Sequence, residues 1–226
     1  FSPNGKGTMK NFVEYTAYLY DQMGNKGMFT TATGSHDEIR MSIHKDEAMI
    51  RCIWAFLLTY KNVPFVYYGD EIGMMYRWLP TKEGGYHRTG TRTPMQWDDS
   101  KNLGFSTADA EQLYLPVDPN PGNATVAAQE ADPDSMLNHI RKVLALRREN
   151  ADLGAYTDMT VYHAEAGDRL FAVKRGEMLV AVNPSLEEKC LKLDGKYEIV
   201  YVFGEAELAE ELKVGKQTMA VLKPVK

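Results

Sequence analysis

The stretch TTATGSHDEIR, Thr30–Arg40, decides the fold of this chain. Small, apolar and β-branched residues run into Gly34, and polar and ionisable side chains follow directly. That pattern is typical of a short buried strand that opens into a loop. A second stretch, VPFVYYGDE at Val63–Glu71, repeats the pattern with a glycine followed by two carboxylates. We therefore expect two parallel strands, with reactive groups gathered beyond their C-terminal ends.

Helical patterns alternate with these strands. Apolar residues recur at helical spacing over Thr8–Met23, and the run Lys45–Tyr60 is apolar over most of its surface. The strands themselves are expected over Met28–Thr33 and Val63–Gly69. Helix and strand in this order are typical of a parallel sheet with crossover helices. A further helix is expected over Ser135–Asn150.

Two regions depart from this rhythm. The segment Asp70–Pro133 has no regular period, and so long a loop is usually functional. After Gly154 the period changes to two, in short β-type runs separated by turn residues: TVYHA, RLFAVKR, MLVAVNPS, KCLKL, YEIVYVF and QTMAVLKP. These runs predict a small antiparallel β-sandwich. We expect an α/β part over residues 1–152 and an all-β domain over residues 153–226.

Composition narrows the class of protein. The chain is 44% hydrophobic and 25% charged, close to the globular average. Its net charge of −5, without a basic cluster, argues against a nucleic-acid partner. No window approaches the roughly 18 apolar residues of a membrane helix, so no membrane partner is expected.

Cysteine usage and the first residues bear on the cellular setting. Cys52 lies in an apolar run and Cys190 in a strand-like run, so we expect two buried thiols and a reducing, cytoplasmic compartment. The opening residues FSPNGKG read as an interior loop. We expect the chain to be a piece of a longer protein, with its N-terminus and any signal peptide upstream.

The candidate chemical groups lie at the two strand exits. His36 and Asp37 follow the first strand, and Asp70 and Glu71 follow the second. A carboxylate beside an imidazole could stabilise positive charge, orient a sugar hydroxyl or transfer a proton. Spacing alone leaves other readings open, since Asp70 and Glu71 could cap a helical turn and His36–Asp37 could form an Asx-type turn.

At these residues a resemblance becomes specific. GSHDEIR resembles the strand-seven motif of the α-amylase superfamily of glycoside hydrolases, in the Ser-His-Asp form of the cyclomaltodextrinase and neopullulanase branch. VPFVYYGDEIGM resembles the strand-eight motif, and RTGTRTPMQWDDSKNLGFS is similar to the segment that follows strand eight in α-glucosidases, oligo-1,6-glucosidases and trehalose synthases. The motifs occur in order over about Phe29–Pro121.

The resemblance implies a fold and an activity. The fold is the C-terminal part of a (β/α)8 barrel, with its last two strands and helices, followed by an antiparallel β-sandwich. The activity is that of a retaining glycoside hydrolase acting on α-glucosidic bonds of short gluco-oligosaccharides. No cofactor and no metal site are expected.

The resemblance also assigns roles to individual residues. Asp37 matches the catalytic carboxylate that stabilises the oxocarbenium-like transition state, and His36 matches a hydrogen-bond donor to the sugar. Arg92 matches an arginine that holds the non-reducing glucose. Arg40 is a substrate-binding candidate, with a salt bridge to a loop carboxylate as the equal alternative. For Trp97 and Tyr86, loop packing is favoured over sugar stacking.

In the superfamily that the chain resembles, the nucleophile and the general acid/base belong to motifs at the ends of strands four and five, which we expect to precede this chain. The chain alone is therefore expected to be inactive, and its open barrel edges are expected to self-associate or to bind the missing N-terminal part. Two alternatives remain. One is a glucosyl transferase or isomerase of the same fold, such as a trehalose synthase. The other is a non-catalytic truncated barrel with a structural or carbohydrate-binding role.

Overall fold

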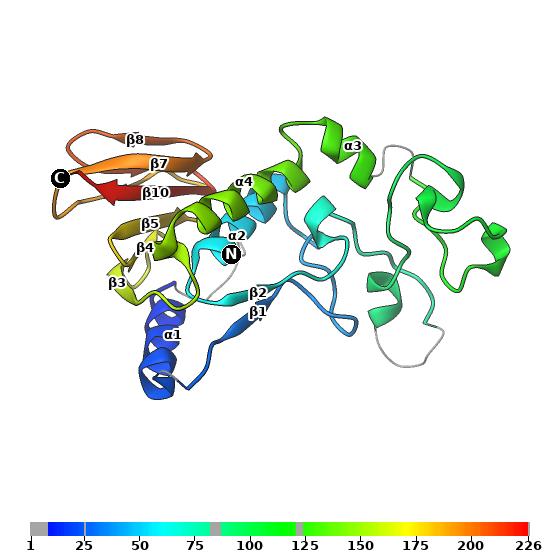
Figure 1. Ribbon diagram of the computed structural model, residues 1–226, viewed down its shortest axis with the longest axis horizontal. Coiled ribbons are helices and arrows are strands. Elements are labelled where there is room, and N and C mark those ends of the chain that lie inside the picture. The colour runs from blue at the N-terminus through cyan, green and yellow to red at the C-terminus, as the bar shows by residue number, and fades with distance from the viewer. Residues whose placement is uncertain (1–8, 25, 82–86, 121–123, 226) are drawn as a thin grey trace. The chain divides into compact units, whose positions relative to one another are not determined.

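A computed structural model describes residues 9–24, 26–81, 87–120 and 124–225 (Figure 1). The chain divides into two compact units. The first unit comprises Phe1–Thr30, Arg51–Val63 and Val143–Lys226, and the second comprises Thr31–Ile50 and Pro64–Lys142. The expected domain boundary at residues 152 and 153 stays a prediction.

The two predicted N-terminal helices are confirmed. Helix α1 spans Met9–Met23 and ends at Gly24, which has a left-handed φ of 56°. Thr8, the first residue of the predicted helix, lies outside the described residues. Helix α2 spans Glu47–Thr59 and begins at Asp46, whose side chain accepts a hydrogen bond from the Met49 N–H at 2.8 Å.

Strands β1, Thr30–Ala32, and β2, Val63–Phe65, form a two-stranded sheet. The Val63 N–H donates to the Phe29 carbonyl at 2.8 Å and the Thr33 N–H donates to the Phe65 carbonyl at 3.0 Å. Because the partners advance together along both segments, the strands are parallel, as predicted. Strand β2 is shorter than expected because the backbone turns after Phe65, and the Tyr67 N–H donates to the Thr33 hydroxyl at 3.0 Å.

The long segment after β2 is built mostly from single turns. Its one described α-helix, α3 at Val126–Ala131, was not predicted, and it begins at Thr125, whose hydroxyl accepts from the Ala128 N–H at 3.2 Å. Helix α4, Met136–Glu149, confirms the third predicted helix. The remaining turns are 3-10 helices: η1 Asp70–Ile72, η2 His87–Thr91, η3 Lys101–Gly104, η4 Ala110–Gln112 and η5 Ala151–Leu153.

The C-terminal strands form two antiparallel sheets, as predicted. The larger has the order β3-β4-β5-β10-β7, with β10 between β5 and β7 (Figure 1). The smaller has the order β6-β9-β8. Their bounds are β3 Met159–Ala164, β4 Phe171–Arg175, β5 Met178–Asn183, β6 Lys189–Leu191, β7 Tyr197–Phe203, β8 Ala206–Leu208, β9 Leu212–Val214 and β10 Thr218–Pro224.

One apolar core joins the two sheets. Leu179 and Leu222 of the larger sheet share a cluster with Leu191 and Leu212 of the smaller one, and all four are almost fully buried. The larger sheet is also buried on its other side, where Phe171 of β4 packs edge-on against Phe56 of α2 with ring centroids 5.5 Å apart. Strands β8 and β9, which have three residues each, were not predicted.

Two arginines, the buried Arg175 and the partly buried Arg147, bind the end of α2 within the first unit. Arg147 donates to the carbonyls of Leu58 and Asn62, each at 2.8 Å. Arg175 donates to the carbonyls of Thr59 and Gly154. Cations at the C-terminal carbonyls of a helix satisfy acceptors that have no partner inside the helix. Burial and the neighbouring Arg147 charge lower the pKa of Arg175 to about 10.

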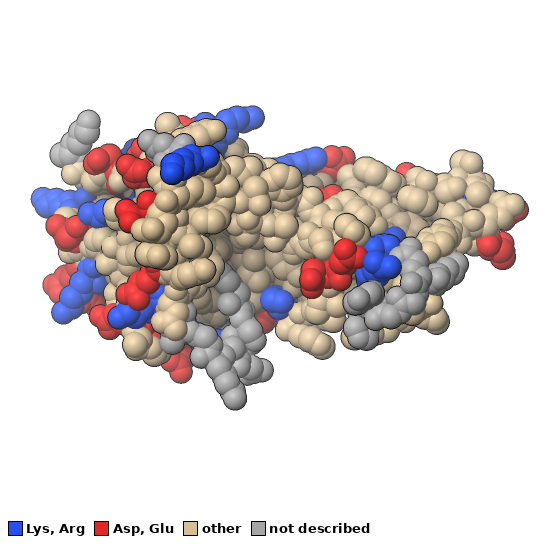
Figure 2. Space-filling model, turned by 90° about the horizontal axis from the view of Figure 1, so that it is seen from below, with Lys and Arg blue, Asp and Glu red and all other residues tan. Residues whose placement is uncertain are grey.

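The cysteine prediction is half right. Cys52 is buried in α2, and burial raises its pKa to about 12. Cys190 is exposed, because on the short strand β6 its neighbour Leu191 takes the inward position. Within the described ranges, none of the helices is both long and apolar enough to cross a membrane. On the face shown in Figure 2, acidic and basic side chains intermingle.

Candidate functional site

The exit of β1 presents His36 and Asp37 to solvent. The chain turns after Gly34, and the Asp37 N–H donates to the Ser35 hydroxyl at 3.2 Å. His36 Nε2 lies 3.0 Å from Asp37 Oδ2, and their side chains are 67% and 51% exposed. The predicted pair is therefore a neighbouring imidazole and carboxylate on an open surface of the second unit.

Two arginines from the segment after β2 converge on Asp37. Arg88 Nη1 lies 3.2 Å and Arg92 Nη2 lies 3.1 Å from Asp37 Oδ1. The Arg92 Nε–H also donates to the His36 carbonyl at 2.8 Å. The hydrogen bond from Arg88, with help from the charges of His36 and Arg92, lowers the pKa of Asp37. Asp37 is therefore an ionised carboxylate at neutral pH.

Arg88 is a site residue that the sequence analysis missed. It precedes Arg92 by four residues in the same phrase, RTGTR, and both side chains reach the same carboxylate oxygen. Arg88 lies in the 3-10 turn η2 and Arg92 directly follows that turn, so the two side chains lie near each other. That spacing was the available signal.

A buried ion pair lies beneath this exposed cluster. Arg40 Nη1 lies 2.9 Å from Asp70 Oδ1, and both side chains are almost fully buried. The same guanidinium donates to the Tyr68 carbonyl at 2.8 Å and to the Thr91 carbonyl at 2.9 Å. The Thr33 hydroxyl donates to the other oxygen of Asp70 at 2.8 Å. These bonds tie the exits of β1 and β2 to η2, the turn that carries Arg88.

This geometry distinguishes between the alternative roles that the sequence left open for Arg40 and Asp70. Arg40 forms the salt bridge that was one of its two expected roles, and its substrate-binding role stays a prediction. Asp70 does not cap η1, because the capping position is Gly69 and the Asp70 carboxylate faces Arg40. Burial raises the pKa of Asp70, and the hydrogen bonds from Thr33 and Arg40 oppose that effect.

Gly69 is required at the exit of β2 for two reasons. Its φ of 85° lies in the left-handed region that other residues rarely adopt. A Cβ atom at this position would lie 2.3 Å from the Met74 sulfur and 3.2 Å from Arg40 Nη1. The glycine that ended the predicted strand therefore makes room for the buried arginine.

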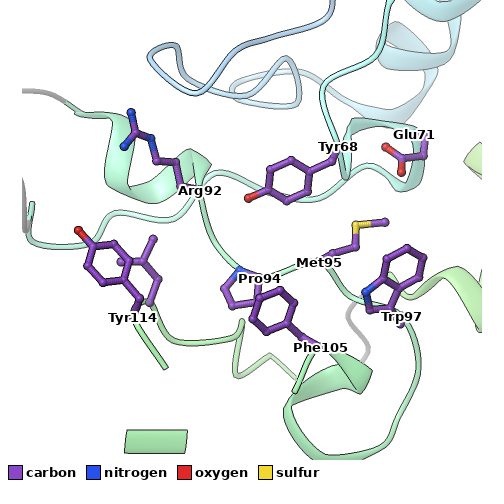
Figure 3. A pocket seen from close by; sticks show the side chains of 9 residues that line it. Tyr68, Glu71, Arg92, Pro94, Met95, Trp97, Phe105 and Tyr114 are labelled. Carbon is purple, nitrogen blue, oxygen red and sulfur yellow. The ribbon is translucent and has the colours of Figure 1, made fainter. Parts of the chain in front are cut away.

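A cavity of about 460 Å³ lies beside the cluster (Figure 3). Arg92 lines it and also contacts Asp37, so the two features share one side chain. The other lining residues are Tyr68, Glu71, Pro94, Met95, Trp97, Phe105, Tyr114 and Leu115. Trp97 is 49% exposed, so loop packing covers only about half of it. Tyr86 lies outside the described residues.

Glu71 is the carboxylate of this cavity. One of its oxygens, Oε2, is buried and has no hydrogen-bond partner. Burial raises the pKa of Glu71, against hydrogen bonds from the backbone at Glu71 and Gly69. Like Asp70, it is not the capping residue of η1. No group of three or more metal-ligating side chains occurs among the described residues.

Comparison with known proteins identifies relatives for this arrangement. Residues 5–155 match the family described as "Alpha amylase, catalytic domain". The salivary alpha-glucosidase of Aedes aegypti is 30% identical over 210 residues, which cover 84% of this chain and 35% of that protein. The trehalose synthase/amylase TreS of Mycobacterium tuberculosis is 33% identical over 149 residues, covering 63% of this chain and 24% of that protein.

Further matches agree in extent. The glucan 1,6-alpha-glucosidase of Streptococcus pneumoniae is 31% identical over 192 residues, covering 71% of this chain and 34% of that protein. A mutant of trehalulose synthase MutB, from crystals soaked with trehalulose, matches with a TM-score of 0.79 at 24% identity over 96% of this chain and 47% of that one. An isomaltulose synthase mutant from Erwinia rhapontici NX5, in complex with D-glucose, has a TM-score of 0.79 at 20% identity.

These matches support the fold, and they show how much of each relative the chain covers. At such low identity the two solved structures support the fold alone. The chain spans about a quarter to a third of the curated relatives and just under half of the solved structures.

Proposed function

Because this chain belongs to the α-amylase catalytic-domain family, we propose that it is the C-terminal portion of a retaining glycoside hydrolase. The substrates are short gluco-oligosaccharides with α-glucosidic bonds. The observation that carries the proposal is the ionised Asp37 carboxylate beside His36, held by Arg88 and Arg92 at the exit of a parallel strand.

Each polar group of the cluster has a place in this chemistry. The transition state of glycoside hydrolysis resembles an oxocarbenium ion, so a fixed carboxylate at Asp37 stabilises the developing positive charge. His36 donates a hydrogen bond to a sugar hydroxyl, and Arg92 orients Asp37 and holds the terminal glucose. Arg40, through Asp70 and the carbonyls that it binds, keeps these loops in place.

The two remaining catalytic carboxylates are proposed to lie outside this chain. Residues 1–152 then form the last part of a (β/α)8 barrel, and residues 153–226 form the β-sandwich that follows it. A nucleophile and an acid/base are both needed to form and hydrolyse a glycosyl intermediate. The 226-residue chain alone is therefore expected to release no glucose from maltose or isomaltose.

The test is a substitution of Asp37 in the longer protein that contains this chain. Asp37→Asn keeps the shape of the side chain and removes its charge, so kcat is expected to fall by about a hundredfold or more. Glucose release from maltose and isomaltose measures the change. Asp109→Asn is the matched control, since the Asp109 side chain is 73% exposed and pairs with Lys101. Unchanged kcat in Asp37→Asn would overturn the proposal.

A second candidate function is glucosyl transfer or isomerisation. It is favoured by relatives named trehalose synthase, among them that of Thermus thermophilus at 32% identity over 158 residues. The same carboxylates serve both reactions up to the glycosyl intermediate, so Asp37 has the same role. Product analysis by NMR separates the two, because maltose yields glucose with a hydrolase and trehalose with such an isomerase.

A further inference from the structure

A second cavity, of about 340 Å³, lies within the first unit. Three parts of the chain line it: the end of α1 with the residues that follow, the turn between α2 and β2, and the segment before β3. They contribute the polar side chains of Tyr20, Lys26, Lys61 and Tyr156. The described lining therefore contains two lysines and no carboxylate. Because a hollow lined by charges of one sign concentrates counter-ions, this cavity favours an anion.

Tyr20 holds Lys61 in place at the wall of this cavity. The Lys61 ammonium nitrogen lies 4.8 Å from the centre of the Tyr20 ring, and the Lys61 side chain is only 14% exposed. The Tyr20 hydroxyl donates to the Lys61 carbonyl. Asp158 Oδ1 lies 3.5 Å from Lys61 Nζ, but the Asp158 side chain is 98% exposed. An ion pair with so exposed a partner is weak, so an anion in the cavity competes with Asp158 for the ammonium group.

Two arginines lie next to the segment that carries Lys61. Arg147 donates to the Tyr60 carbonyl at 3.3 Å and to the Asn62 carbonyl at 2.8 Å, so it binds the backbone on either side of Lys61. Arg175 is fully buried, and burial and then the charge of Arg147 lower its pKa. The two guanidiniums are therefore like charges near each other, beside a cavity that already contains two lysines.

The charges of both arginines reach the cavity itself. Burial raises the pKa of Tyr20, and a hydrogen bond at the Phe29 backbone and the charges of Arg175 and Arg147 oppose that rise. Tyr20 lines the cavity, so both guanidiniums contribute to the potential inside it. Among the described residues, both arginines donate to backbone carbonyls and form no ion pair, although the charge of Asp152 acts on Arg175. A buried charge without a counter-charge is costly, and an anion in the cavity lowers that cost.

We propose that this cavity binds a small phosphate monoester, with the phosphate at Lys26 and Lys61 and the organic part against Tyr156. A phosphate monoester carries about two negative charges at neutral pH, and its terminal oxygens accept hydrogen bonds from ammonium groups. The volume of about 340 Å³ leaves room for a ring beside the phosphate, and Tyr156 is 88% exposed, so its own ring is open to contact. None of these residues belongs to the Asp37 cluster, so this inference does not depend on the proposed function.

The test is calorimetric titration of the 226-residue chain with phenyl phosphate, inorganic phosphate and phenol, none of which is a sugar. Phenyl phosphate is expected to bind, inorganic phosphate to bind more weakly, and uncharged phenol not to bind. Lys26→Gln and Lys61→Gln are each expected to weaken the binding of phenyl phosphate by about tenfold or more, since each removes a charged hydrogen-bond donor. Asp158→Asn frees the Lys61 ammonium and is expected to tighten binding about twofold to fivefold.

Lys213→Gln is the matched control. Lys213 also belongs to the first unit and pairs with one carboxylate, Glu207 at 3.2 Å, but it does not line the cavity. Weaker binding in both cavity variants, with unchanged binding in Lys213→Gln, supports the site. Circular dichroism verifies that each variant is folded, and Lys26→Gln, at an exposed residue, decides the question if Lys61→Gln does not fold.

Four results would overturn the site. Equal losses in Lys213→Gln and in the cavity variants would show a general effect of net charge. Undiminished binding in Lys26→Gln and Lys61→Gln would place the phosphate elsewhere on the chain. Phenol that binds as tightly as phenyl phosphate would exclude recognition of the anion. Absence of phenyl phosphate binding at millimolar concentration would show that the cavity does not take this class of ligand.

Discussion

A single side chain, Arg40, connects three segments that the sequence separates. It binds Asp70, the Tyr68 carbonyl and the Thr91 carbonyl from a position where it is only 1% exposed. A buried charge without its partner is far more costly than an exposed one. The pair therefore supports the site by holding loops, while Asp37 above it remains accessible.

Removing this guanidinium should destabilise the chain strongly. Arg40→Met leaves the Asp70 carboxylate buried and uncompensated, so the free energy of unfolding is expected to fall by about 3–5 kcal/mol. Urea denaturation measures the loss. Adding Asp70→Asn should recover part of it, because a neutral amide is less costly to bury. Lys101→Ala, which breaks an exposed pair with Asp109, should cost less than about 1 kcal/mol. Equal losses in Arg40→Met and Lys101→Ala would contradict this role.

Arg88 should control the ionisation of Asp37. Its hydrogen bond is the largest cause of the lowered pKa, so Arg88→Gln is expected to move the pKa of Asp37 up toward its ordinary value of 3.8. NMR titration of the carboxyl carbon measures the shift. Arg141→Gln, which removes a pair with Glu130, serves as the control. An Asp37 pKa that does not respond to Arg88→Gln would refute the assignment.

The direction of the pH dependence follows from the same shift. The pKa of Asp37 is lower in the folded chain than the ordinary value of 3.8. The stabilisation from its ion pairs is therefore fully present above that value, and it is lost as the pH falls through the lowered pKa. The loss of stability at low pH should be smaller in Arg88→Gln, because in that variant the pKa values of Asp37 in the folded and unfolded chain lie closer together.

The turn at the exit of β2 depends on two glycines with different surroundings. Gly69 and Gly73 both have left-handed φ angles, of 85° and 70°. A Cβ at Gly69 would meet Met74 and Arg40, whereas a Cβ at Gly73 would have no atom within 4 Å. The two positions therefore separate backbone strain from steric overlap.

Paired substitutions at this turn exploit that difference. Gly73→Ala adds only the left-handed strain and is expected to cost about 1 kcal/mol. Gly69→Ala adds overlap with Met74 and displaces Arg40, so it is expected to cost about 3 kcal/mol. Urea denaturation of both variants gives the comparison. Equal costs would show that the fit around Arg40 is loose.

For the elements, prediction succeeded where a periodic pattern was long. Helices α1, α2 and α4 and the strands of the larger sheet carry enough residues for a period to show. Helix α3 has six residues and strands β8 and β9 have three each, and their formation depends on contacts with neighbours that a local pattern does not contain. Strands β1 and β2 also have three residues each, but the longer runs that end at Gly34 and Gly69 marked them in the sequence. The exposure of Cys190 likewise depends on which face of β6 packs against its neighbours, and the local pattern did not show this.

Over the whole molecule, the parallel strands β1 and β2 are the least complete feature. Among the described residues neither strand pairs with a further strand, and Phe65 and Val66 beside them are 56% and 49% exposed. Open edges with apolar neighbours favour pairing with another chain. We expect concentration-dependent self-association, measured by light scattering across a dilution series. A clean monomer at high concentration would contradict it, and Leu186→Ser, at an exposed residue of the first unit, should leave the association unchanged.

The sequence by itself determined helices α1, α2 and α4, the parallel pair of β1 and β2, six strands of the antiparallel C-terminal sheets, and the motifs that contain His36, Asp37 and Arg92. These follow from local periods and from short motifs, which neighbouring residues encode. Only the tertiary structure decided that Arg88 joins Asp37, that Arg40 is buried on Asp70 and that Glu71 faces an aromatic cavity. Arg40 and Asp70 lie 30 residues apart in the chain, and Arg88 and Asp37 lie 51 apart. Their electrostatic and packing energies depend on distance in space, and a local sequence pattern does not record that distance.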